Sequence, residues 1–199
     1  MALFLMLALL LGGGALAQER VPTAEEIGEI QVSLTPEEGR RRLFPEAHTF
    51  TPQQRIFNAG QAAAVREALG RPLDADSLEV YLARDSENRL LGYAVVAEEI
   101  GKYRPITFMV GVTPGFAVRE VAVMVYRESR GGEVRRGRFL SQYRGKGLRD
   151  PLQLNRDIVN ISGATLSVRA LNAGVRRVLH SLEALYGGQV QTPAVGAAE

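Results

Sequence analysis

Residues 160–167 read Asn-Ile-Ser-Gly-Ala-Thr-Leu-Ser and join a polar loop to the last long amphipathic segment of the chain. From this point the larger apolar residues recur every three to five positions, at Leu166, Leu171, Val175, Val178, Leu182 and Leu185. Such spacing places them on one face of a helix. The sequence therefore predicts a long C-terminal amphipathic helix that begins at Ser162-Gly163-Ala164-Thr165.

A helix N-terminus has chemistry of its own. Its first N–H groups have no intrahelical partner and carry the positive end of the helix dipole, so a phosphate group is stabilised there. Gly163 would let a ligand approach the backbone, and Thr165 would bring a hydroxyl to the same place. The alternative interpretation is that Ser162 is an ordinary N-cap without a ligand.

Four strand-like segments precede this helix, at residues 78–84, 90–98, 106–113 and 117–126. They are rich in Val, Leu and aromatic residues and are separated by short turns, which is typical of an antiparallel meander. With helices before and after it, the meander predicts an α+β fold: an antiparallel β-sheet flanked by helices, ending in the long amphipathic helix. We expect this main domain to span residues 76–186.

Two helix-start patterns occur before the meander. Residues 35–38 read Thr-Pro-Glu-Glu and residues 51–54 read Thr-Pro-Gln-Gln, each with a cap residue, Pro at the first helical position and Glu or Gln at the third. They predict one helix ending near Leu43 and another running to about Leu69, with Gly70 as its stop. We interpret residues 18–75 as an N-terminal helical subregion.

The two ends of the chain predict segments outside the domain. An apolar run at residues 2–11 is followed by three glycines and by Ala15-Leu16-Ala17, the pattern of a secretory signal peptide at residues 1–17. The sequence thus predicts export to an extracytoplasmic place, the periplasm or cell envelope. Residues 187–199 are small, polar or Pro-bearing, which predicts a disordered tail.

Composition narrows the function classes. The chain contains no cysteine, so thiolate iron–sulfur ligation and disulfides are excluded, and its two histidines, His48 and His180, lie far apart without a carboxylate cluster at ligand spacing. We therefore expect no metal site. Lys and Arg number 24 against 22 Asp and Glu, and no nucleic-acid-binding motif accompanies the basic clusters, so no nucleic-acid partner is expected. Any redox chemistry would need an organic cofactor.

The stretch Ser162-Gly163-Ala164-Thr165-Leu166-Ser167 resembles the flavinylation motif of the FMN-binding domain family, which includes the C subunit of the sodium-translocating NADH:quinone reductase and the G subunit of the Rnf complex. The resemblance runs from about Leu78 to Tyr186 and includes residues 101–107. It implies that a separate flavin transferase joins the phosphate of FMN covalently to the hydroxyl of Thr165.

A second segment, residues 126–133, is similar to the family loop that approaches the flavin. The cofactor-binding residues implied by the resemblance are Thr165, Ser162, Gly163, Ala164, Leu166, Glu128 and Ser129. Two positions depart from the family pattern: Val159 stands where an aspartate is usual, with Asp157 two residues earlier, and the loop has Ser129-Arg130 in place of Thr-Pro.

The resemblance implies an exported electron carrier with FMN on Thr165, exchanging electrons with membrane-bound electron-transfer proteins rather than acting as an enzyme on its own substrate. Val159 leaves open a protein that binds or senses FMN without a covalent bond. A flavin-free interaction module is the third alternative.

Overall fold

The computed structural model describes residue 23 and residues 29–188, so the predicted signal peptide and residues 189–199 of the predicted tail lie outside the described part. Six antiparallel strands form one sheet in the order β1-β6-β5-β4-β3-β2. The strands are β1 (Gln31–Val32), β2 (Thr49–Ile56), β3 (Ser77–Arg84), β4 (Leu90–Ile100), β5 (Pro105–Val112) and β6 (Val118–Tyr126). The predicted α+β class and the four-strand meander are confirmed.

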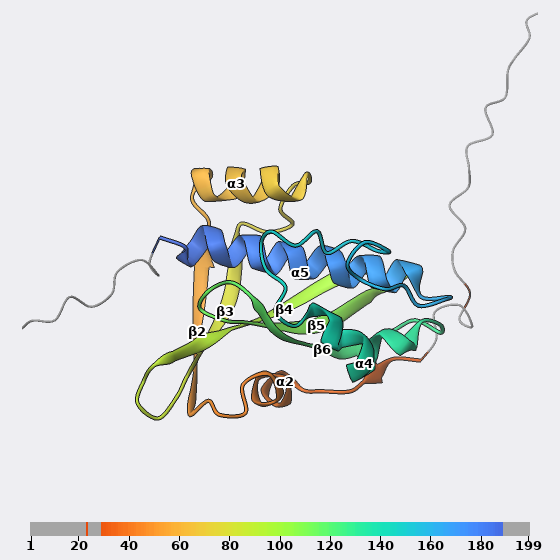
Figure 1. The fold of residues 1–199 in the computed structure, drawn as a ribbon, viewed down its shortest axis with the longest axis horizontal. Coiled ribbons are helices and arrows are strands. Elements are labelled where there is room, and N and C mark those ends of the chain that lie inside the picture. The colour runs from red at the N-terminus through yellow and green to blue at the C-terminus, as the bar shows by residue number, and fades with distance from the viewer. Residues whose placement is uncertain (1–22, 24–28, 189–199) are drawn as a thin grey trace, which may run out of the picture.

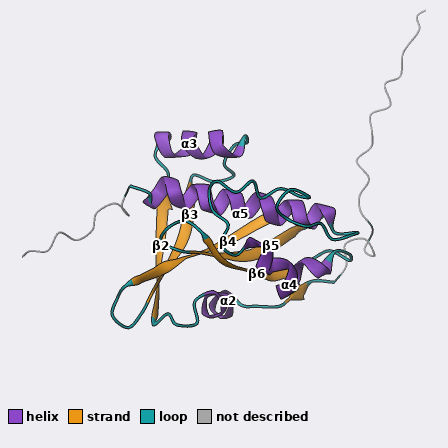
Figure 2. Cartoon of the chain, in the orientation of Figure 1, coloured by secondary structure: helices purple, strands orange, loops and turns teal. Residues whose placement is uncertain are grey.

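Helices cover both faces of this sheet (Figures 1 and 2). They are α2 (Pro36–Leu43), α3 (Ala59–Leu69), α4 (Gly137–Leu140) and α5 (Thr165–Tyr186), with the 3-10 turns η1 (Gly132–Arg135) and η2 (Ser141–Tyr143). α5 packs on one face and α2 on the other, while α3 lies on the outer side of α5. The predicted C-terminal helix is thus the central element of the larger core.

The middle strand β5 shows why both faces must be covered. Phe108 and Val110 face the cluster that contains α5, whereas Met109 faces the cluster that contains Leu43 and Phe44 of α2 and its C-cap. All three β5 side chains are fully buried. Because neighbouring strand residues point to opposite faces, a continuous apolar strand needs a packing layer on each side.

The predicted helix beginning at Thr51 is wrong. Residues 49–56 form β2, which pairs with β3 from Thr49 opposite Arg84 to Ile56 opposite Ser77. β2 is an edge strand, where Pro52 can be accommodated because one side of the strand has no partner to bond. The N-terminal region is therefore only partly helical.

The helix expected there begins at Ala59 instead. Its N-cap is Asn58, which forms a capping box with Gln61. The predicted end is confirmed, since Gly70 caps the helix in the left-handed conformation with φ 66°. The other predicted helix, α2, has the Thr35 capping box and the end at Leu43 that the sequence indicates.

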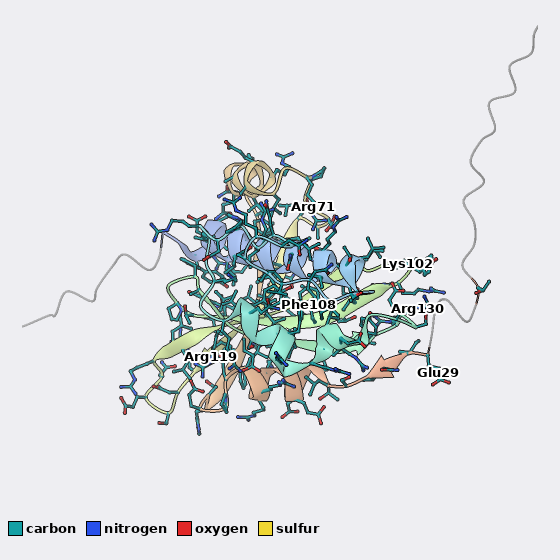
Figure 3. The ribbon with its side chains drawn as sticks, turned by 45° about the vertical axis from the view of Figure 1, so that its right-hand side comes forward. Glu29, Arg71, Lys102, Phe108, Arg119 and Arg130 are labelled. Carbon is teal, nitrogen blue, oxygen red and sulfur yellow. The ribbon has the colours of Figure 1, made fainter. Side chains whose placement is uncertain are left out.

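Gly174 allows α5 to lie close to the sheet. A Cβ at this position would stand 2.4 Å from Cζ of the buried Phe108 and 2.9 Å from Cγ of Glu99 (Figure 3 labels Phe108). Neither approach is possible without displacing the helix or the ring.

We expect Gly174→Ala to lower the free energy of unfolding by about 2 kcal/mol, because overpacking exceeds the gain in helix propensity. Chemical denaturation measures the change, and Gly137→Ala, whose Cβ would meet nothing within 4 Å, is the matched control. Equal stability of the two variants would contradict the close packing of α5.

Candidate functional site

A hollow of about 430 Å³ lies where three segments meet. They are the start of α5, the loop that follows β4 and the loop that follows β6. Its lining residues are Lys102, Tyr103, Glu128, Ser129, Arg130, Gly163, Ala164, Thr165, Leu166 and Ser167. Six of the seven residues predicted to bind the cofactor therefore come together, from segments separated by more than thirty positions in the chain.

The seventh residue, Ser162, lines a neighbouring hollow together with Gly163. Its interpretation as the helix N-cap is wrong. The N-cap is Ala164, and Ser162 lies in a turn that the N–H of Ala164 closes by donating to the carbonyl of Ile161 at 2.9 Å. Gly163 has φ 80°, a conformation that glycine adopts without strain at the third position of such a turn.

This turn leaves the start of α5 without a side-chain cap in the described part of the chain. The first helical hydrogen bond runs from the N–H of Val168 to the carbonyl of Ala164. The N–H groups of Thr165, Leu166 and Ser167 precede it, and these residues line the hollow. An uncapped helix N-terminus beside a hollow is a favourable place for an anion.

Thr165 is the first residue of α5 rather than the third position after a cap. Its hydroxyl oxygen accepts a hydrogen bond from Nδ2 of Asn160 at 3.1 Å. The other end of the Asn160 amide is also engaged, because Oδ1 accepts the N–H of Ile161 at 2.9 Å. Asn160 is thereby held in one orientation, and it fixes the position of the Thr165 oxygen.

Ser167, the nearer of the two competing hydroxyls, is buried and already bonded. Its Oγ lies 3.0 Å from the hydroxyl of Tyr126, which donates to the carbonyl of Arg130 at 2.5 Å. Burial raises the pKa of Tyr126, so this phenol stays protonated at neutral pH. Thr165, which is only partly buried, is the hydroxyl of α5's first turn that faces the hollow.

Glu128 is a buried carboxylate that holds the opposite wall. Its Oε1 accepts the N–H groups of Lys102 at 2.6 Å, Tyr103 at 2.7 Å and Arg104 at 3.0 Å. Gly101 allows this approach, since a Cβ there would be 2.8 Å from the same oxygen. Glu128 therefore links the loop after β6 to the loop after β4, and both loops line the hollow.

The three aromatic residues considered as possible ring contacts, Tyr126, Phe139 and Tyr143, all belong to the core. Phe139 and Tyr143 pack edge to face with centroids 5.9 Å apart, and the hydroxyl of Tyr143 donates to Oδ1 of Asn172 at 2.6 Å. Core packing, the commoner fate of buried aromatics, is therefore the role that the structure shows for them.

Asp157 does not replace the aspartate that is usual at position 159. Its carboxylate accepts the N–H groups of Leu152 and Gln153 and forms an ion pair with Lys146 at 3.0 Å. Burial acts to raise the pKa of Asp157, but these bonds outweigh it and hold that pKa below its usual value. The group is committed to its own loop, while the side chain of Val159 is exposed.

The described residues show no cluster of His, Asp or Glu that could hold a metal ion, and no described helix is long and apolar enough to cross a membrane. His180 is half-buried on α5, where burial lowers its pKa. Neither histidine lines the hollow beside Thr165.

Four contributors to the site have no role that the sequence predicts: Lys102, Tyr103, Arg130 and Asn160. The first two lie in the segment that carries the family resemblance, but only the structure shows that Glu128 turns that segment toward α5. Asn160 had a local signal, since a side-chain amide just before a helix commonly bonds to nearby groups in its first turn.

We expect Asn160→Leu, which keeps the side-chain volume and removes the amide, to slow attachment of a group to Thr165 about tenfold, the loss caused by about 1.4 kcal/mol of positioning energy. The rate of flavin incorporation, followed by in-gel fluorescence, measures this effect. Val159→Leu is the control at the adjacent exposed position and should leave the rate unchanged. An unchanged rate in Asn160→Leu would show that the amide does not position the hydroxyl.

Comparison with known proteins gives a family and a fold. Residues 101–180 match the model of the FMN-binding domain family. NqrC from Shewanella oneidensis is similar in structure with a TM-score of 0.52 at 17% sequence identity, over 74% of this chain and 86% of that chain. The NqrC-type protein of the Na(+)-translocating NADH-quinone reductase from Parabacteroides distasonis gives a TM-score of 0.48 at 14% identity, over 81% of this chain and 87% of that chain.

No curated protein sequence matches the chain significantly. The matched segment contains the loop after β4, the loop after β6 and the start of α5, and so all the walls of the hollow. The resemblance to the FMN-binding domain family is confirmed by this match, and the similarity to the Shewanella protein shows a shared fold.

Proposed function

We propose that this chain, whose residues 101–180 form an FMN-binding domain, is an exported electron carrier with FMN joined through its phosphate to Oγ1 of Thr165. The observation that carries the proposal is the uncapped start of α5, which presents the Thr165 hydroxyl and three N–H groups to one hollow. The bound flavin would supply one- and two-electron redox chemistry.

The residues around Thr165 fit a phosphate ester. The N–H groups of the first helical turn favour its negative charge, and Lys102 and Arg130 line the same hollow. Oγ1 of Thr165 would lose its proton on forming the ester, and Asn160 would then donate to the ester oxygen instead of the hydroxyl. Leu166, which is 43% exposed at this edge, would cover apolar surface of the cofactor.

The chain's own residues also limit the site to one acceptor. Ser167 is buried against Tyr126, and Ser162 lies in the turn outside the helix, on the neighbouring hollow. A flavin transferase that recognises the turn and the first helical residue would therefore reach Thr165 first. We propose such a transferase as one partner and membrane-bound electron-transfer proteins as the others.

Noncovalent binding of FMN is the second candidate, and Val159 favours it because the usual aspartate is missing. The two candidates differ in one observable. Protein co-expressed with a flavin transferase is denatured in acid and separated from free flavin. Flavin absorbance that stays with the protein supports the ester, whereas complete release of FMN supports noncovalent binding.

Export is part of the same proposal and rests on the signal-peptide pattern at residues 1–17. We expect mature protein to begin at Gln18 and to be recovered from the extracytoplasmic fraction. N-terminal sequencing of fractionated cells checks this, and cytoplasmic protein that retains Met1 would contradict it.

A further inference from the structure

Three hollows form one continuous surface around Thr165. The first shares Ser129, Arg130 and Gly163 with the second, and the second shares Glu133 and Arg136 with the third. Five basic side chains line this surface, and we call them the cationic rim: Lys102, Arg130, Arg135, Arg136 and Arg138. Figure 3 shows Lys102 and Arg130 at the same end of the molecule.

The cationic rim carries more charge than the surrounding carboxylates neutralise. Two acidic residues line the same surface: Glu128, which is turned toward backbone N–H groups, and Glu133, which is exposed. The lining therefore has a formal charge of +3, whereas the whole chain has +2. The positive charge of the protein is thus concentrated around the proposed cofactor site.

Among the described residues, the basic groups of the rim form no salt bridge. Other arginines of the sheet and helices do, as Arg119 pairs with Glu46 at 2.7 Å and Arg177 with Glu99 at 2.9 Å. Four of the five rim residues, all except Arg135, are also exposed. They are available to an outside partner.

Buried neighbours hold the rim in place. Val134 is fully buried between Glu133 and Arg135, and Phe139 and Leu140 are buried directly after Arg138. Gly131, with φ 81°, lets the chain approach Tyr126 and α5 closely. The arginines are therefore presented by an anchored segment, which lowers the entropy lost when a partner binds.

Apolar groups lie inside the rim. The side chain of Val159 is 70% exposed and lines the third hollow, and that of Leu166 is 43% exposed and lines the first. An apolar centre surrounded by polar groups and rich in arginine is the usual anatomy of a protein–protein interface. An anionic membrane would be served equally well by lysine, yet four of the five rim residues are arginine.

We propose that the cationic rim is the docking surface for an electron-transfer protein whose redox centre is surrounded by acidic residues. This inference rests on the proposed function, because it needs a redox cofactor at Thr165. Charge complementarity would steer the partner toward the site and place the two redox centres close together.

Two one-electron acceptors of opposite surface charge test the proposal: plastocyanin, which is acidic, and cytochrome c, which is basic. Reduced flavin-loaded protein is mixed with each in a stopped-flow instrument at increasing salt. We expect the rate with plastocyanin to fall steeply with salt, since steering weakens as charges are screened, and the rate with cytochrome c to rise or stay constant.

Charge reversal locates the effect. The double variant Arg136→Glu with Arg138→Glu should lower the plastocyanin rate at low salt about tenfold, within the range of steering effects, and raise the cytochrome c rate. Arg41→Glu with Arg66→Glu changes the same charge at exposed positions of α2 and α3 and is the matched control. Equal effects of the two double variants would overturn the proposal.

A binding measurement separates this proposal from the function on which it rests. Titration calorimetry of flavin-free protein with plastocyanin needs no cofactor, and we expect salt-sensitive binding that the rim variant loses and the control variant keeps. Absence of binding would overturn the docking surface even if Thr165 carries FMN. Binding of the rim to anionic phosphatidylglycerol vesicles without binding of plastocyanin would also overturn it, in favour of a membrane surface.

Discussion

Thr165→Val will abolish covalent attachment of FMN and leave the protein folded. Valine keeps the β-branched shape of threonine and removes the oxygen that would form the ester. The hydroxyl bonds only to Asn160 among the described residues, and Asn160 remains tied to Ile161 in the variant. The loss should therefore be complete for the flavin and below about 1 kcal/mol for the free energy of unfolding.

Intact-mass analysis after co-expression with a flavin transferase measures the first effect, and chemical denaturation measures the second. Thr165→Ser is the matched control, because it retains a hydroxyl at the first position of α5 and should still accept FMN. Ser162→Ala should also keep the flavin. Covalent FMN that persists in Thr165→Val, or that moves to Ser162 or Ser167, would disprove the assignment.

Glu128→Ala is expected to have the largest effect on stability among changes at the site. One buried carboxylate oxygen accepts three N–H groups of the loop after β4, and alanine would leave all three without it. Hydrogen bonds to charged groups contribute about 1.5–3 kcal/mol each in isolation, but part of this loop is exposed and water can replace some of them. We expect a loss of about 3 kcal/mol.

Glu128→Gln is the control, because its amide oxygen can still accept the same N–H groups without the negative charge. It should lose less than half as much stability. Both variants should change the flavin spectrum if the loop after β4 borders the cofactor, since Lys102 and Tyr103 would shift. Normal stability of Glu128→Ala would show that the carboxylate does not hold the wall of the hollow.

The sequence predicts those parts of the fold that depend on local periodicity. The alternation of residues 118–126 and the apolar stripe of α5 each require burial of one face, so they identify a strand and a helix without knowledge of their neighbours. The capping box at Thr35 is equally local. The prediction for residues 51–56 is wrong because Thr-Pro-Gln-Gln has a helix-start pattern, and pairing with β3 outweighs it.

The site was predictable to the extent that one short motif carries it. Ser162 has the residue type of an N-cap, since serine commonly caps helices, whereas Gly163 in a turn moves the start of α5 to Thr165. The contact between Glu128 and residues 102–104 joins segments more than twenty positions apart, and no local pattern encodes it. The same holds for the cationic rim, whose members become neighbours only in the folded chain.

The central claim is that Oγ1 of Thr165 carries FMN. Peptide mapping by mass spectrometry of protein co-expressed with a flavin transferase tests it most directly, because it identifies the modified residue and the modifying group together. We predict one peptide that contains residues 160–169, heavier by one phosphoester-linked FMN, with the fragment ions assigning the group to Thr165. An unmodified peptide with all flavin released on denaturation, or a modification on another residue, would contradict the account.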